Sequence, residues 1–437
     1  MSLQQIIAII IFLCTMGAII TGKVHNTVAS LTGAACLVLT HILSIEDCID
    51  AVDVETICIL VGMMLLVAVI KNSGIFEYIA IKAAKIAKGR PWPIMVIFIL
   101  ITAVCSGMLD NVTTVLLVGP MTLAITNILK VDPVPYIITQ IMASNIGGTA
   151  TLIGDPPNIM IGSAANLSFV DFILNTGVAT VFVIIVGLIC MYFIYGRKLF
   201  VTDESIAKVM QLDENKAIKD RKLMHESVIV IILVALCFIF HDQLGVQSCT
   251  VAIAAACIML LIGGQEPEEI IADVEWPTIL FFIGLFIVVG GMKKVGVITM
   301  LANGLISITH GNMVVTMMVI LWVSAIVSSF LDNIPFVATL IPMILTMQAE
   351  GMDVTPIWWA LSLGACLGGN GTLVGNNDVT IVGGIGTLIG ASANVVLSGI
   401  SKNNGHPITF GQYFKIGFPM MILSIIVCSV FLLIRFA

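Results

Sequence analysis

The sequence predicts an all-α polytopic membrane protein built from two related halves, each with about five transmembrane helices and one re-entrant hairpin. Two observations lead to this prediction. First, 59% of the 437 residues are hydrophobic and only 10% are charged, whereas a soluble chain carries about 25% charged residues. Second, an Asp-Asn pair interrupts a long apolar run at Asp110-Asn111 and again 222 positions later, at Asp332-Asn333. Polar breaks at corresponding positions of two halves are typical of secondary transporters.

Apolar stretches long enough to cross a bilayer recur along both halves. The first run, Ile6 to Ile20, lacks the basic start and small-residue cleavage site of a signal peptide, so we expect a retained first span. The stretches fall at 4–21, 26–43, 56–70, 137–163, 177–196, 227–241, 247–263, 276–291, 356–396 and 417–434.

Two longer apolar runs, 92–129 and 313–347, each contain one of the Asp-Asn pairs near the middle. Irregular backbone at membrane depth is tolerated only where protein or a water-filled cavity satisfies it. We therefore predict two re-entrant hairpins whose tips lie at a buried site. Because each hairpin enters and leaves on one side, each half has five spans, and an odd number inverts the second half relative to the first.

The basic residues predict the orientation. With the N-terminus outside, 16 of the 19 lysines and arginines fall in cytoplasmic loops, and only Lys293, Lys294 and Arg435 fall outside. Since cytoplasmic loops carry the excess of basic residues, we expect both termini outside and the polar linker 197–226 inside. The net charge of −7 does not form a patch that would indicate a nucleic-acid partner.

Three acidic residues, Asp110, Asp155 and Asp332, lie inside apolar segments, and a fourth, Asp378, lies in an unusual Gly-rich stretch of the second half. An ionised group at the bilayer centre costs at least about 2.5–3.5 kcal/mol on insertion scales, so each is a candidate functional residue. The structural alternative is that Asp110 and Asp332 act as helix N-caps. The two roles are compatible, because a capped helix N-terminus aimed at the membrane centre also attracts anions.

The segment around Asp155 cannot continue a helix. Three glycines and the pair Pro156-Pro157 occur between 147 and 157, so the span must unwind and free backbone groups. Thr149, Thr151 and Asn158 add side-chain oxygens, which a hard cation such as Na⁺ prefers. Burial favours the neutral form of a carboxyl group, so we expect Asp155 to exchange the coupling proton, with Na⁺ held by Asp155, Thr149 and Asn158 as a possible alternative.

Neither the cysteines nor the histidines form a metal-binding pattern. Eleven cysteines are scattered without CxxC spacing and are expected to be small buried hydrophobes. The alternative is a soft-ligand role for Cys105 or Cys366, which lie near the polar segments. His41 and His241 lie at span ends, where an interfacial role is favoured over a proton relay. No bound cofactor is expected beyond the coupling ion.

Six motifs give a resemblance to a known family. They are 61–90, LDNVTT (109–114), SNIGGTATLIGDPPN (144–158), LDNIPFVATLIP (331–342), GACLGGNGT (364–372) and LIGASANVV (388–396). Together they resemble the ion transporter superfamily, in particular its arsenite permease (ArsB)/P-protein branch, which is related to the Na⁺/H⁺ antiporter NhaD and to citrate/dicarboxylate transporters. The resemblance implies an elevator-type homodimer in which the hairpins and broken helices move against a scaffold.

On this resemblance the chain divides into two repeats and a linker. The first repeat, 1–196, has scaffold helices at 1–91, a transport part at 92–163 and a lateral helix at 177–196. The cytoplasmic linker covers 197–226. The second repeat, 227–437, has scaffold helices at 227–312, a transport part at 313–396 and a last helix at 417–434.

The resemblance and the polar segments together give the expected substrate- and ion-binding residues. One departure affects the second half, where 15 extra residues around 376–390 separate GGNGTLVG from ASAN. The expected residues are Asp110, Asn111, Thr113, Thr114, Asn145, Gly147, Gly148, Thr149, Thr151, Gly154, Asp155, Asn158, Asp332, Asn333, Gly369, Asn370, Gly371, Thr372, Ser392 and Asn394.

The predicted function is secondary active transport of a small inorganic ion or oxo-species in a prokaryotic plasma membrane, coupled to H⁺ or Na⁺. Efflux of arsenite or antimonite is the first candidate, because Asp110 stands where the dicarboxylate branch has Ser and would repel a dicarboxylate. A Na⁺/H⁺ antiporter, an anion transporter or a passive anion channel are the alternatives. An intramembrane aspartyl protease is a remote one, since Leu152 to Asp155 only loosely matches GxGD. No GxxxxGK[ST] motif is present, so a gradient or a separate ATPase subunit must supply energy.

Overall fold

The computed structural model describes residues 1–21, 23–373 and 392–437, and every element in this described part is helical. The all-α prediction is therefore confirmed. The first half contains α1 (Leu3–Thr21), α2 (Asn26–Leu39), α3 (Ile45–Ala51), α4 (Val54–Lys71), α5 (Ile75–Ile86), α6 (Pro91–Met108), α7 (Asn111–Leu129), α8 (Val134–Thr149), α9 (Pro156–Ala165), α10 (Phe169–Phe172) and α11 (Val178–Met191).

The linker carries one short helix and one 3-10 turn, and the second half repeats the order of the first. The elements are α12 (Asp203–Met210), η3 (Glu214–Ala217), α13 (Arg221–Leu244), α14 (Ser248–Ile262), α15 (Pro267–Ala272), α16 (Trp276–Lys294), α17 (Val297–Thr309), α18 (Met313–Phe330), α19 (Asn333–Ala349), α20 (Thr355–Gly368), α21 (Ser392–Asn403) and α22 (Phe410–Phe436).

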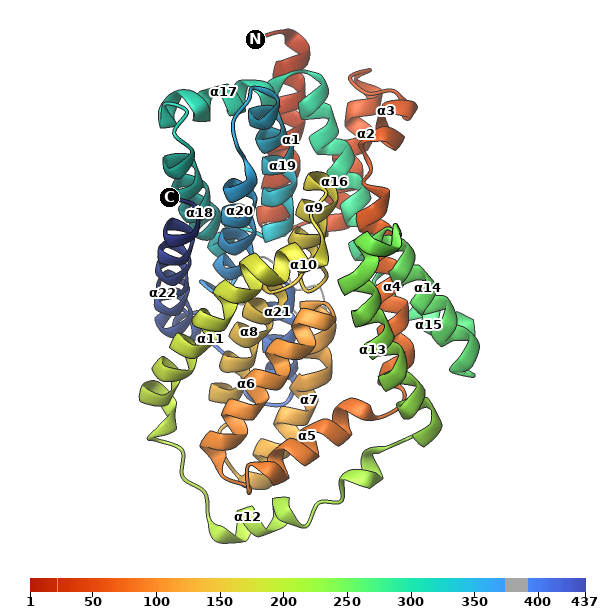
Figure 1. Ribbon diagram of the computed structural model, residues 1–437, viewed down its shortest axis with the longest axis vertical. Helices are drawn as coiled ribbons and strands as arrows, with labels where there is room; N and C mark the ends of the chain where they lie inside the picture. Colours follow the sequence, from red (N-terminus) through yellow and green to blue (C-terminus); the bar gives the residue numbers. More distant parts are fainter. Residues whose placement is uncertain (22, 374–391) are drawn as a thin grey trace.

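Nine helices of the described part are long and apolar enough to cross a membrane. They include α6, α7 and α18, which the Asp-Asn pairs place in the two predicted hairpins. Length and composition therefore allow these helices to cross, and their re-entrant path stays a prediction. The N-terminus and α17 lie at one end of the molecule and α12 lies at the other (Figure 1).

Helices of the two halves pack against each other in two matching pairs. Helix α4 packs on α14, and α16 packs on α2. A Cβ atom on Gly62 of α4 would lie 2.7 Å from the Ala252 backbone, and one on Gly284 of α16 would lie 2.7 Å from the Ser30 backbone. Gly62 and Gly284 are 222 positions apart in the sequence, and so are Ser30 and Ala252. The same close approach at a glycine therefore occurs twice and joins the two halves.

Two ion pairs at the C-terminal ends of α4 and α16 also cross between halves. Lys71 Nζ lies 2.7 Å from Asp273 Oδ2 after α15, and Lys294 forms an ion pair with Asp47 of α3. The Lys294 ammonium holds the pKa of Asp47 well below its usual range. Cations at a helix C-terminus also complement its dipole, so these contacts fix the ends of α4 and α16.

Three predicted helix starts are wrong. The last helix, predicted at 417–434, begins at Phe410, after a Thr409–Gln412 capping box. Helix α13 begins at Arg221 rather than at 227, because Asp220 Oδ1 accepts hydrogen bonds from the amides of Lys222 and Leu223 at 2.8 and 3.0 Å. The lateral helix predicted at 177–196 begins at Phe169, where a Ser168–Asp171 capping box starts it, and continues through π-helical turns at 173–177 and 192–196. Hydropathy reports the apolar part of a helix and misses polar first turns.

Candidate ion-binding site

Both hairpin tips are capped by their aspartates. Asp110 Oδ1 accepts a hydrogen bond from Thr113 N at 2.8 Å, and the Thr113 hydroxyl donates to Asp110 Oδ2. Asp332 Oδ1 accepts from Ile334 N at 3.1 Å. Each aspartate is 7% exposed. The capping role is therefore present at both tips, and it holds each carboxyl group at the N-terminus of a buried helix.

The span around Asp155 is broken as the glycines and prolines predict. Helix α8 ends at Thr149 and α9 begins at Pro156. The side-chain amide of Asn158 closes the break, because its Nδ2 donates to Gly148 O at 3.2 Å, Thr149 O at 3.2 Å and Thr151 O at 2.9 Å. Carbonyls at a helix C-terminus have no partner within the helix, so Asn158 satisfies groups that the break exposes.

The second half has the same closure. Helix α20 ends at Gly368, and Asn394 Nδ2 donates to Gly369 O at 2.6 Å and Thr372 O at 3.3 Å. When GGTATLIG is aligned with GGNGTLVG, Gly369 corresponds to Gly148 and Thr372 to Thr151. Asn394 is thus the counterpart of Asn158.

Serine and threonine hydroxyls tie each break to its neighbouring hairpin. Thr151 donates to Gly107 O, and its counterpart Thr372 donates to Ser329 O. Ser106 donates to Ser144 O at 2.7 Å in the first half. Its counterpart in the second half is the bond from Ser328 to Ala365 O at 2.5 Å. The hairpin helices α6 and α18 are therefore held to α8 and α20 by matching bonds.

The two breaks meet each other. Asn145 Nδ2 donates to Asn394 Oδ1 at 2.9 Å, and Cys366 Sγ, at the position that corresponds to Asn145, donates to Asn158 Oδ1 at 3.5 Å. Asn158 Oδ1 also accepts from Ser362 Oγ at 2.6 Å. Each break is therefore completed by a donor from the other half. Cys366 thus contacts the predicted site, as its sequence neighbourhood suggested.

Asp155 lies where the second hairpin tip reaches the first break. Its side chain is 1% exposed, and Asn333 Nδ2 donates to Oδ1 and Oδ2 at 3.4 and 3.3 Å. Asp110 and Asp332, at the two hairpin tips, are also buried. Within the described residues none of these three carboxyl groups forms an ion pair with a lysine or arginine. The site is therefore acidic and suits a proton, a cation or a neutral hydroxyl species.

Two polar atoms at the meeting point have no hydrogen-bond partner among the described residues. They are Asn145 Oδ1 and Asn370 Nδ2, although Asn370 Oδ1 accepts from Asn145 Nδ2 at 2.9 Å. Asn145 is 0% and Asn370 1% exposed. Because buried polar atoms are nearly always paired, this acceptor and this donor mark the meeting point as a candidate binding position.

The remaining predicted residues are Asn111, Thr114, Thr149, the glycines and Ser392. Thr149 donates to Asn145 O at 2.6 Å, and Ser144 donates to Asn111 O at 3.1 Å, so these backbone oxygens are engaged. Thr114 is buried and its hydroxyl lacks a partner in the described part of the chain. Packing accounts for the glycines, whose Cβ positions would clash with neighbouring backbone or side chains at Gly147, Gly148, Gly154 and Gly371. The side chain of Ser392 and the insertion 376–390 lie outside the description.

One predicted role changes. Asn158 was expected to help hold Na⁺, but its oxygen already accepts from Ser362 and Cys366 and its nitrogen spans three carbonyls. Binding a cation through this amide would displace those bonds. Sequence reasoning missed the hydroxyls of Ser106, Ser328 and Ser362; the 222-residue spacing of Ser106 and Ser328 was the signal that could have found the first two.

Broken helices whose polar ends meet inside a bundle of apolar helices are typical of secondary transporters, and this chain is an integral membrane protein of that class. A family model described as CitMHS, citrate transporter, matches residues 16–364. The chain belongs to this family, within the ion transporter superfamily, and is a transporter rather than an enzyme.

Two relatives and one solved structure extend the comparison. An uncharacterized transporter of Mycobacterium bovis is 39% identical over 441 residues, covering 99% of both chains. The P protein of Sus scrofa is 32% identical over 520 residues, covering 99% of this chain and 59% of its own length. The crystal structure of the Alcanivorax borkumensis YdaH transporter has a similar fold, with a TM-score of 0.58, 14% identity, and coverage of 86% of this chain and 84% of that one.

Proposed function

We propose that this protein moves a small inorganic ion or oxo-species through the site between the two helix breaks, coupled to H⁺ through Asp155 or to Na⁺. The carrying observation is the position of Asp155, which is fully buried in the first break and hydrogen-bonded by Asn333 from the second hairpin. A carboxyl group at this place changes its interaction with the other half whenever it gains or loses a proton.

The substrate class follows from the groups that face the meeting point. They are carboxyl groups, amides and hydroxyls, with the single thiol of Cys366 beside Asn158. Neutral As(OH)₃ or Sb(OH)₃ can donate hydrogen bonds to the carboxylates and accept them from the amides, and a thiol is a soft ligand for either. We therefore propose efflux of arsenite or antimonite as the activity to test first.

The family description names citrate, which is a polycarboxylate anion. Asp110, Asp155 and Asp332 have no basic partner in the described part of the chain. A polycarboxylate would be repelled unless it enters with a proton or bound to a cation. The second candidate is therefore Na⁺/H⁺ antiport, in which Asp155 binds either ion in turn. An anion transporter or channel is the third.

We further propose that transport follows an elevator mechanism in two inverted repeats. Helices α6 to α9 and α18 to α21 would form the moving part. The scaffold would then consist of α1, α2, α4, α13, α14 and α16. The packed pairs α4–α14 and α16–α2 support a rigid scaffold, because in each pair a helix of one half closely crosses a helix of the other. Assembly as a homodimer, and any separate ATPase subunit, are expectations from the family resemblance.

The test is a substrate screen in proteoliposomes. Arsenite, antimonite, Na⁺, citrate and chloride are offered in turn across an imposed pH gradient, with internal pH and substrate content as readouts. We expect arsenite or antimonite to dissipate the gradient. Movement of citrate alone would contradict the proposed substrate class. A reversal potential that follows chloride, without any response to pH, would indicate a channel instead.

A further inference from the structure

The linker between the halves packs along helix α5 as a strap. Figure 1 shows it crossing beneath the first half, from the end of α11 to the start of α13. Helix α12 packs against α5 and α7, and η3 packs against α5. Val209 of α12 is fully buried in a cluster with Ala84 of α5 and Met95 of α6. A segment that buries apolar side chains in this way has a defined docked position.

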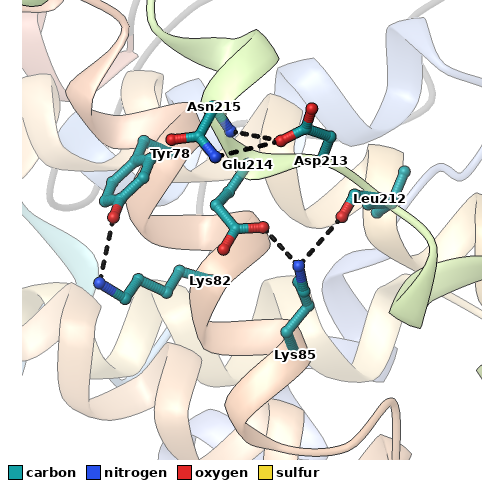
Figure 2. A network of polar contacts seen from close by, with 7 residues as sticks. All are labelled: Tyr78, Lys82, Lys85, Leu212, Asp213, Glu214 and Asn215. Atoms are coloured by element: carbon teal, nitrogen blue, oxygen red, sulfur yellow. Dashed lines mark hydrogen bonds and ion pairs between the residues drawn. The ribbon is translucent and has the colours of Figure 1, made fainter.

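One lysine of α5 fastens the strap (Figure 2). Lys85 Nζ lies 2.5 Å from Glu214 Oε2 and donates to Leu212 O at 3.2 Å. The Lys85 ammonium holds the pKa of the Glu214 carboxyl below its usual range. Asp213 Oδ1 accepts from the backbone and side chain of Asn215 at 3.1 and 3.2 Å, which shapes the turn that presents Glu214.

The strap covers both ends of α5, where the backbone turns. Gly74 precedes the helix with φ +81° and Gly89 follows it with φ +65°. A Cβ at Gly74 would overlap the carbonyl oxygen of Ala217, and one at Gly89 would lie 3.0 Å from the side chain of Ile206. A glycine in the left-handed region tolerates changes of its backbone dihedral angles, so each end of α5 can act as a hinge. The strap contacts both hinges.

Backbone hydrogen bonds strengthen the contact at the first turn. The amides of Lys219 and Asp220 both donate to Ser73 O, at 3.0 and 3.4 Å. Lys219 Nζ also lies 3.7 Å from Glu77 Oε1. Backbone bonds between a linker and a hinge residue must break before the hinge can rotate, so the strap and the hinge are mechanically coupled.

The corresponding helix of the second half, α17, has open hinges. Gly296 precedes α17 with φ +78°, and its Cβ position would meet only Gln5 Nε2, at 4.0 Å, among the described residues. Gly311 follows α17 with φ +66°, and a Cβ there would meet no described atom within 4 Å. Helices α5 and α17 therefore have hinge glycines at matching positions. Among the described residues, the strap packs against α5 and leaves the hinges of α17 open.

We infer that the linker is a strap that limits the rate of transport by restraining the hinges of α5, with the Lys85–Glu214 pair as its fastening. The inference rests on the proposed elevator movement, in which α5 joins the scaffold to the moving hairpin. It also explains why α12 contacts α7, since one segment then bridges the stationary and the moving parts.

The experiment uses charge reversal in the full-length protein. In Glu214→Lys and in Lys85→Glu the fastening becomes a like-charge pair. In the double exchange Lys85→Glu/Glu214→Lys the attraction is restored. Glu226→Lys is the matched control, because it makes the same charge change in the next helix, where Glu226 pairs only locally with Lys222 at 3.6 Å. Two quantities are measured in each variant: the initial transport rate and amide hydrogen exchange at 217–220.

We expect each single reversal to speed hydrogen exchange at 217–220 by about two- to fivefold, in line with the loss of a partly exposed ion pair. The transport rate should rise severalfold in the same variants. In the double exchange both quantities should return most of the way to wild-type values, because a glutamate at 85 restores the ion pair but cannot donate to Leu212 O. The control should leave both unchanged. Hydrogen exchange needs no substrate, so it reports strap docking even if the proposed substrate is wrong.

Three results would overturn the inference. Unchanged exchange in both single variants means that the pair does not fasten the strap. Faster exchange with an unchanged transport rate means that the strap docks without limiting the cycle. Failure of the double exchange to restore either quantity means that the reversals act through something other than this pair. If the wild type transports none of the tested substrates while hydrogen exchange at 217–220 responds to the reversals as expected, the result contradicts the proposed function and leaves the docking of the strap intact.

Discussion

Asn145 donates a hydrogen bond of 2.9 Å to Asn394, a residue 249 positions later in the chain, and so joins the helix break of the first half to that of the second. The reciprocal contact, from Cys366 to Asn158, has a thiol in place of the amide. The amide contacts of the two breaks thus match, except that a thiol replaces one amide. The first break also contains the buried carboxyl group of Asp155, just before α9.

The amides that close the breaks should be essential for stability. Replacing Asn158 by Ala leaves three backbone carbonyls and two donors without their partner. Because a buried unpaired group costs about 1–3 kcal/mol, we expect a loss of about 2–4 kcal/mol. Asn394→Ala should cost less, because Asn394 has fewer partners. The measurement is the fraction that stays monodisperse after heating in detergent. Exposed Asn404→Ala is the control, and equal melting of all three would count against this account.

The matching threonines should both contribute to stability. Thr151→Val and Thr372→Val each remove one hydroxyl that bonds a hairpin carbonyl while keeping the side-chain shape. We expect Thr372→Val to lower stability by about 1 kcal/mol and Thr151→Val by about 2 kcal/mol, because the Thr151 hydroxyl also accepts from Gly154 N at 3.1 Å. The double variant should show the sum. The same heating assay measures this. If only one of the two variants is destabilised, the two breaks do not have equivalent roles.

Substitution of Cys366 distinguishes a site that binds arsenite through sulfur from one that binds it through hydroxyls and amides. Cys366→Ser keeps a donor for Asn158 Oδ1 but loses the sulfur. If arsenite is bound through sulfur, its uptake by proteoliposomes should fall at least about tenfold in this variant, a change of about 1.4 kcal/mol. If hydroxyls and amides suffice, Cys366→Ser transports normally. Buried Cys428→Ser, on α22, is the matched control and should transport at the wild-type rate in both cases.

Orientation is tested by labelling single added cysteines. Lys216 lies exposed in the linker and Lys293 lies exposed at the end of α16. From the basic-residue distribution we expect Lys216→Cys to react with an impermeant thiol reagent only from the cytoplasmic side, and Lys293→Cys only from the outside. Wild type supplies the background from the native cysteines. Labelling in the opposite pattern would invert the topology.

Much of the site could be predicted because glycine, proline and charge have strong local effects. The break at Asp155 follows from Gly147 to Pro157, and the helix order of the second half follows from the 222-residue repeat. The partner of each amide could not be predicted, because Asn158 meets Cys366 only after both halves fold together. The docking of the linker was missed for a similar reason: hydropathy carries no information on where a polar segment packs.

The central claim is that Asp155 couples transport to protons, and its most direct test is the pH dependence of Asp155→Asn in proteoliposomes. This substitution keeps the size and the contact with Asn333 but removes the titrating group. Asp132→Asn, in an exposed loop, is the control. We expect the variant to fold and insert as wild type does, yet to lose substrate-driven proton movement and the dependence of its rate on pH between about 6 and 8. A wild-type pH profile with undiminished proton movement in Asp155→Asn would contradict the account.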